Sequence, residues 1–153
     1  MMAGTVILAL AYGVGQQINY PLKREVEHLA NKGYPVYTQH DLGVILELKT
    51  GALLLMAHQP GDHISSLAII EQFAQAAKVN GWKSVKLVAA RQHLWRCARD
   101  LKEVLPEIYV DKIPVETAYL PDIQPWVTSP LRWWMRELII RILPWSLYRR
   151  LCG

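Results

Sequence analysis

Short apolar runs alternate with segments of helical period along most of this chain. The runs are continuous, as in parallel strands that are covered by helices on both faces. The expected strands are residues 5–12, 34–38, 52–57, 84–90 and 108–115. Between them apolar residues recur at three- and four-residue spacing, and the expected helices are residues 21–32, 62–79 and 93–105. Residues 41–50 suit either a short helix or an extended piece.

Local signals mark the ends of the expected helices. Pro21 lies in the first turn of the first helix and Gly33 follows its end, while Pro106 ends the third helix. Repeated alternation of strand and helix implies right-handed crossovers and a parallel sheet. We therefore expect an α/β, doubly wound, mainly parallel five-stranded sheet of the three-layer Rossmann-like type. Its strand order is expected to be 3-2-1-4-5, with the reversal between the first and fourth strands.

The helix expected at 93–105 has the clearest division between apolar and polar positions. The expected inward residues are Leu94, Cys97, Ala98, Leu101, Val104 and Leu105. The expected outward residues are Arg96, Arg99, Asp100, Lys102 and Glu103. This division predicts an amphipathic helix with its charged side in solvent.

Length and composition indicate one globular domain. The chain has 153 residues, of which 52% are hydrophobic and 20% charged, enough for a core without metal or disulfide. We expect a Rossmann-like domain over residues 1–120, with residues 121–153 as a Pro-, Trp- and Arg-rich helical extension packed on it. Cys97 and Cys152 are the two cysteines, which fits a reducing cytoplasm.

The N-terminal residues resemble a buried strand more than a signal peptide, because no basic region precedes them. No window approaches about 18 uninterrupted apolar residues, so no transmembrane helix is expected. A cytoplasmic location follows, with peripheral contact at a membrane surface as a second possibility. The net charge of +4 comes largely from C-terminal arginines and makes no basic stripe, so no nucleic-acid partner is expected.

Polar residues collect in the loops after the expected strands, where open α/β sheets bind ligands. The candidate ligand-binding residues are Gly13, Gly15, Ser65, Ser66, Arg91 and Arg96. The glycines let the backbone approach a ligand closely, and a helix that begins near Ser65 offers free N–H groups. The two arginines suit a phosphate or a carboxylate. The sequence therefore predicts a small anionic ligand, with His93 as the candidate for proton transfer in any reaction.

Each of these residues also has a purely structural interpretation. The glycines suit a tight turn, Asp62 or Ser65 a helix cap, His93 a helix start and Arg96 a solvated helix face. A weaker alternative is a metal site built from His40, His58 and His63 through neutral imidazoles. The spacing of these histidines matches no known ligand motif.

The segment LVAARQHLWRCARDL resembles the YdcF/SanA/ElyC-like bacterial family, a domain of unknown function. In that family a strand ending in Val-Thr-Ser is followed by His-x-x-Arg-Ala. His93 and Arg96 match the His and Arg of this motif, whereas an Ala-Ala pair replaces Thr-Ser. The resemblance extends over about fifteen residues. HISSLAI is similar to the family's Ser-x-x-Thr segment, and SPLRWWMREL is similar to its closing helix, with Arg136 and Glu137 as the Arg-Glu pair. The acidic Ser-Glu step after the family's second strand is absent.

The resemblance implies a Rossmann-like fold and a nucleotide-like ligand such as S-adenosylmethionine, the cofactor reported for one branch. Other branches act in bacterial envelope biogenesis. The first functional hypothesis is thus a YdcF-like domain that binds an anionic, nucleotide-like small molecule at the C-terminal edge of the sheet. The alternative is a non-catalytic, envelope-associated or adaptor protein. Whether the chain is an enzyme stays open.

The C-terminal tail carries the alternative hypothesis. After Pro130 one broad helical face is expected to hold Leu131, Trp134, Met135, Leu138, Ile139 and Ile142, and Pro144 should break the helix. Residues 130–153 suit a last helix packed on the sheet, a segment at the surface of an anionic bilayer, or a homodimer contact.

Overall fold

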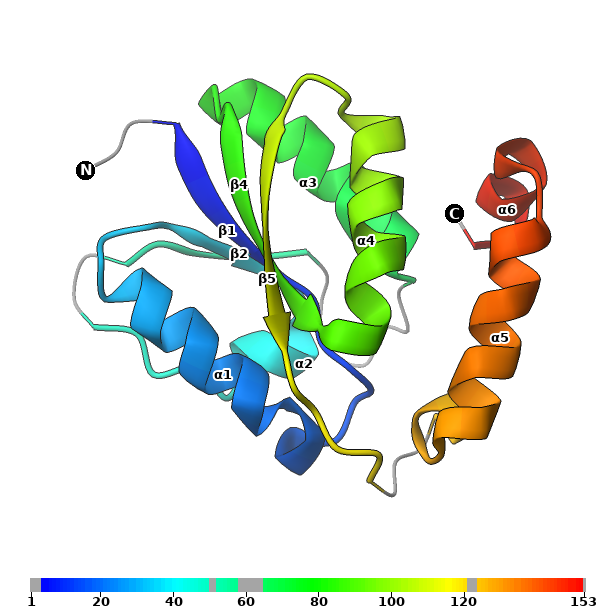
Figure 1. Ribbon diagram of the computed structural model, residues 1–153. Coiled ribbons are helices and arrows are strands. Elements are labelled where there is room, and N and C mark those ends of the chain that lie inside the picture. Colours follow the sequence, from blue (N-terminus) through cyan, green and yellow to red (C-terminus); the bar gives the residue numbers. More distant parts are fainter. Residues whose placement is uncertain (1–3, 50–51, 58–64, 121–123, 153) are drawn as a thin grey trace.

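The fold is a five-stranded, all-parallel sheet with helices on both faces (Figure 1). The computed structural model describes residues 4–49, 52–57, 65–120 and 124–152. Its strands are β1 (Thr5–Ala9), β2 (Val36–Thr38), β3 (Leu54–Met56), β4 (Ser84–Ala90) and β5 (Tyr109–Val115). Their order is β3-β2-β1-β4-β5. The predicted Rossmann-like fold class and strand order are confirmed.

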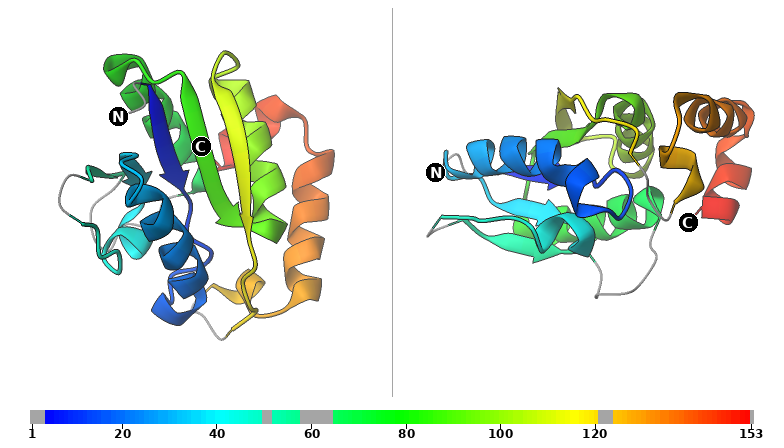
Figure 2. Two further views of the ribbon diagram at one scale, coloured as in Figure 1. Left: turned by 60° about the vertical axis from the view of Figure 1, so that its left-hand side comes forward. Right: turned by 90° about the horizontal axis from the view of Figure 1, so that it is seen from below.

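Two pairs of helices sandwich the sheet, as the view from below shows (Figure 2). The helices α1 (Gln16–Ala30) and α2 (His40–Gly43) pack on one face, and α3 (Ser66–Asn80) and α4 (Arg91–Val104) pack on the other. Alternate residues of β1 enter the two cores, so Leu8 faces α3 and α4 while Ile7 faces α1. This two-sided burial explains why the strand is a continuous apolar run.

The loop after β1 and the start of α1 form one hydrogen-bonded unit through Asn19. Its side-chain oxygen accepts from the Tyr12 N–H at 2.8 Å, and its amide nitrogen donates to the carbonyls of Gly13 and Gly15 at 3.2 and 2.9 Å. The helix therefore begins at Gln16, more than a turn before the start predicted at Pro21. Of the ambiguous segment 41–50, the described residues 41–49 form the rest of the short α2 and an irregular stretch.

The charged side of α4 is partly buried, which corrects the expectation that it faces solvent. Arg96 is 3% exposed and Asp100 is fully buried. The cause is the C-terminal segment, in which the turn η1 (Pro125–Val127) leads to α5 (Pro130–Ile142) and α6 (Trp145–Cys152). These helices lie beside α4 on the side away from the sheet (Figure 1). The predicted break at Pro144 is confirmed.

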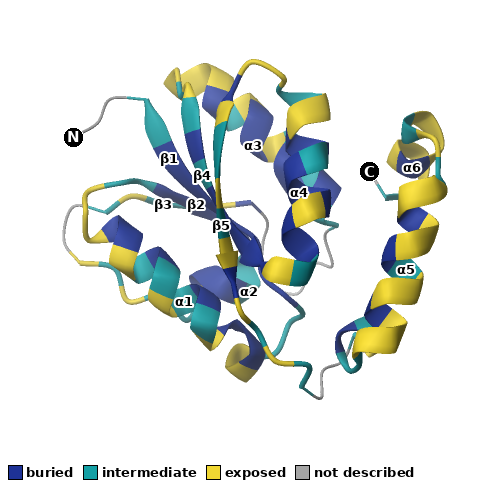
Figure 3. Ribbon diagram, in the orientation of Figure 1, coloured by how far each residue is buried: buried dark blue, intermediate teal, exposed yellow. Residues whose placement is uncertain are grey.

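Helix α5 turns its broad apolar face outward. Its buried residues are Trp133, Glu137 and Ile140, whereas the whole face predicted from the helical period is exposed (Figure 3). Within the described part of the chain, no helix combines the length and apolar character that a bilayer crossing requires.

Candidate ligand pocket at the sheet edge

A pocket of about 140 Å³ opens at the carboxyl edge of the sheet, close to the reversal between β1 and β4. Its wall includes Tyr12 and Gly13 after β1 and Gln39 after β2. The start of α3, the first turns of α4, the turn η1 with the preceding Gln124, and one side of α5 complete it. The position agrees with the general rule that open α/β sheets bind ligands outside the carboxyl ends of their strands.

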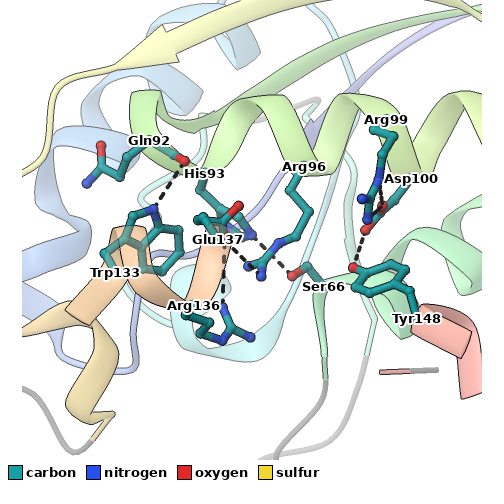
Figure 4. Close-up of polar contacts among 10 residues, drawn as sticks. All are labelled: Ser66, Gln92, His93, Arg96, Arg99, Asp100, Trp133, Arg136, Glu137 and Tyr148. Atoms are coloured by element: carbon teal, nitrogen blue, oxygen red, sulfur yellow. Dashed lines mark hydrogen bonds and ion pairs between the residues drawn. The ribbon is translucent and has the colours of Figure 1, made fainter. Parts of the chain in front are cut away.

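A serine and a histidine meet inside this pocket (Figure 4). Ser66, at the first position of α3, lies with its Oγ 3.1 Å from His93 Nε2 in the first turn of α4. His93 is only 5% exposed. Burial, together with the positive charges of Arg96 and Arg136, holds the pKa of His93 well below its ordinary value of 6.5. The imidazole is therefore neutral at pH 7, and one of its ring nitrogens can accept a hydrogen bond.

An ion pair between α4 and α5 forms the charged wall of the pocket. Arg96 Nη1 lies 3.0 Å from Glu137 Oε1, with the two side chains 3% and 1% exposed. Arg136 Nη1 approaches the same oxygen at 3.9 Å, and this second guanidinium remains one-third exposed. Burial raises the pKa of Glu137, against the opposing effect of the two arginines. Two guanidinium groups thus share one carboxylate, and the wall carries a net positive charge.

Trp133 holds α5 against the sheet edge. Its indole Nε1 donates a hydrogen bond to the Gln92 carbonyl at 3.2 Å. The ring packs edge-to-face on Tyr12 and His93, at centroid distances of 4.8 and 5.5 Å. Because this side chain is buried and bonded at its polar end, it fixes the position of the neighbouring Arg136.

A second polar cluster fastens α6 to α4. The Tyr148 hydroxyl donates to Asp100 Oδ2 at 2.6 Å, while the Arg99 guanidinium donates to Oδ1 at 2.7 and 2.9 Å. Arg99 also lies over the Tyr148 ring, 4.4 Å from its centroid. Burial raises the pKa of Asp100, and the hydrogen bonds from Tyr148 and Arg99 oppose that change. Both carboxylate oxygens are satisfied, so this cluster serves packing and lies apart from the pocket.

The structure brings five of the predicted site residues to the pocket wall: Gly13, Ser65, Ser66, His93 and Arg96. Gly13 has a φ of +77°, so its turn is one that glycine adopts readily. The Ser65 hydroxyl caps α3 by accepting from the Ala68 N–H at 3.1 Å, and it donates to the Cys152 carbonyl. Ser65 therefore serves the helix start and the C-terminal helix, as its structural interpretation expected.

Two of the predicted site residues do not line the pocket. Arg91 points its guanidinium to Glu116, and both side chains are largely exposed. Gly15 precedes α1 as its N-cap. In the metal alternative, His40 begins α2, while His58 and His63 lie outside the described residues. No group of three metal-ligating side chains occurs within the described ranges.

Sequence reasoning missed Arg136, Glu137 and Trp133 as parts of the site, and one signal could have revealed them. From Gln124 onward the chain has five arginines and a single carboxylate, Glu137. A lone acid among apolar and basic residues on a helix suggests a buried ion pair, because a buried charge requires a partner. The cationic partner, Arg96, could be recognised only once the helices were placed side by side.

No protein-family model matches the sequence, and no curated protein is significantly similar to it. The resemblance to the YdcF/SanA/ElyC-like family therefore stays a prediction.

Proposed function

We propose that this protein binds a small anionic, nucleotide-like molecule through its phosphate or carboxylate group, at the carboxyl edge of the sheet. The observation that carries the proposal is the excess of positive charge at the pocket wall, where Arg96 and Arg136 share the single carboxylate of Glu137. An anion compensates this excess, and a planar guanidinium offers it paired donors.

Two further features support an anion at this place. The buried Arg96 Nε and His93 Nδ1 have no hydrogen-bond partner among the described residues, although buried polar atoms are normally paired. The start of α3, with Ser66 in its first turn, also borders the pocket and contributes the positive end of a helix dipole. The resemblance noted in the sequence points to the same ligand class.

The size of the pocket bears on which part of the ligand enters. A volume of about 140 Å³ suits a charged group with a few waters rather than a whole nucleotide. S-adenosylmethionine would present only its carboxylate, which stands beside a cationic amine. A nucleoside monophosphate presents a more strongly charged group, and we expect it to bind more tightly.

Ligand-induced stabilisation tests the proposal. The thermal midpoint is measured with inorganic phosphate, adenosine monophosphate and S-adenosylmethionine at increasing concentrations. A ligand at about 100 times its dissociation constant stabilises the fold by about 2.7 kcal/mol, which raises the midpoint of a domain of this size by several degrees. Arg136→Ala should weaken binding at least tenfold.

Arg132→Ala is the matched control, because this arginine is exposed on the same helix and does not line the pocket. It should bind like the natural chain. Equal binding by the Arg136→Ala variant, or no stabilisation by any of the three compounds, would contradict the proposed site. Arg136 is preferred to Arg96 for this test because the buried Arg96 also supports the fold.

A further inference from the structure

The outward face of α5 consists of six apolar residues that the structure leaves uncovered. They are Leu131, Trp134, Met135, Leu138, Ile139 and Ile142, and each is between 48% and 74% exposed. At about 100° per residue they occupy one continuous side of the helix. An exposed apolar surface of this kind marks an interaction site, whereas isolated exposed apolar residues do not.

The helix cannot rotate to bury this face, because its other side is fixed. Trp133 and Ile140 are packed inward, and Glu137 between them pairs with Arg96 of α4 at 3.0 Å. Rotation would carry that buried carboxylate into solvent and leave Arg96 buried without a partner, which is costly. The outward face is thus a stable feature of the folded chain.

Among the described residues from Gln124 onward, every exposed charged side chain is an arginine. Arg132 and Arg141 lie at its two edges by helical period, and Arg150 is exposed on the adjoining α6. The segment's one carboxylate, Glu137, is buried and paired. Arg141 also lies over the rings of Trp95 and Trp134, at 4.3 and 5.6 Å.

We infer that the outward face of α5 docks on the surface of an anionic lipid bilayer, with the helix lying in the plane of the interface. An apolar side bordered by arginines, with a half-exposed tryptophan, matches the chemistry of lipid headgroups above acyl chains. A second copy of the chain fits less well, because a two-fold contact would bring Arg132 and Arg141 against the same arginines. The pocket residues Trp133 and Arg136 lie on the opposite side of the helix, so the docked protein keeps its pocket free of lipid.

Vesicle flotation tests this inference. The full chain is mixed with vesicles of phosphatidylcholine alone or of phosphatidylcholine with phosphatidylglycerol. We expect binding to the anionic vesicles at least tenfold stronger than to the neutral ones, and weakening as salt screens the arginines. Leu138→Ser with Ile142→Ser should reduce binding to anionic vesicles at least tenfold without changing the net charge.

The matched control is Val79→Ser with Tyr109→Ser, which removes two apolar side chains that are 86% and 67% exposed elsewhere. This control should float like the natural chain, and circular dichroism should show that both double variants are folded. No flotation, equal binding to neutral and anionic vesicles, or equal loss in the control would overturn the inference. A dimer in sedimentation that the Leu138→Ser, Ile142→Ser variant abolishes would also overturn it.

The two proposals can fail separately. Arg136→Ala should leave flotation unchanged, because this side chain faces the pocket and not the outward face. Leu138→Ser with Ile142→Ser should in turn leave ligand-induced stabilisation unchanged.

Discussion

Helix α4 has two buried faces of opposite chemistry. One face packs Leu94, Cys97, Ala98 and Leu101 on the sheet. The other places His93, Arg96 and Asp100 against α5 and α6, where each meets a polar or aromatic group. The packing of the first face follows from hydrophobic burial alone, and that interaction is non-directional. The second depends on matched partners, so it specifies where the C-terminal helices lie and it builds the pocket.

This difference predicts that the fold loses stability when one partner of a pair on the polar face of α4 is removed. Glu137→Ala leaves Arg96 buried without its carboxylate, and breaking a buried pair in this way costs about 3–5 kcal/mol. Urea unfolding should show this loss. Glu116→Ala is the control, since its exposed pair with Arg91 should contribute less than about 1 kcal/mol.

The double variant Arg96→Met, Glu137→Leu sharpens this result. It replaces both charges by apolar side chains of similar size, and such replacements are often neutral or stabilising. Recovery of most of the lost stability would show that pairing, not shape, is what Glu137→Ala removes. A double variant as unstable as Glu137→Ala would contradict this account of the polar face.

A smaller effect is expected where α6 meets α4. Tyr148→Phe removes the hydroxyl that donates to the buried Asp100, and losing a hydrogen bond to a charged group costs about 1.5–3 kcal/mol. The free energy of unfolding measures this change. Tyr109→Phe, at a tyrosine that is 67% exposed, should change it by less than about 0.5 kcal/mol. If both variants lose the same free energy of unfolding, the hydrogen bond does not fasten α6.

The smallest expected effect concerns pH. The pKa of His93 is lowered in the folded chain, so below about pH 6.5 the unfolded chain binds a proton that the folded chain does not. This group therefore reduces stability as pH falls below 6.5, and it contributes no pH dependence above that value. His93→Gln should lose less stability than the natural chain between pH 7 and pH 5. A parallel decline in the two proteins would show that His93 is not held neutral.

The sheet and its flanking helices were predictable because they depend on patterns within short windows. Continuous apolar runs and helical spacing identified β1, β4 and α4 and the strand order. The residues at which the helices begin were less predictable. Helix α1 starts at Gln16 because Asn19 joins it to the preceding loop, and that hydrogen-bonded unit has no simple signature in the sequence.

The pocket was predictable in part. His93, Arg96 and Ser66 follow from the rule that ligands bind at the carboxyl edge, and the structure brings them together. Arg91 follows from the same rule, yet it turns to Glu116 instead. The rule places a loop at the edge but does not decide where a long, flexible side chain points.

The sequence by itself determined the parallel sheet, the order of its strands and the loops at which polar residues gather, because these depend on local periodicity and chain connectivity. Only the tertiary structure decided which side of α5 is buried. By hydrophobicity alone the face with Leu138 and Ile142 should be inside. The buried pair of Glu137 with Arg96 and the hydrogen bond of Trp133 to the Gln92 carbonyl instead fix the opposite side. Those partners lie about forty residues apart in the chain and meet only in the folded protein.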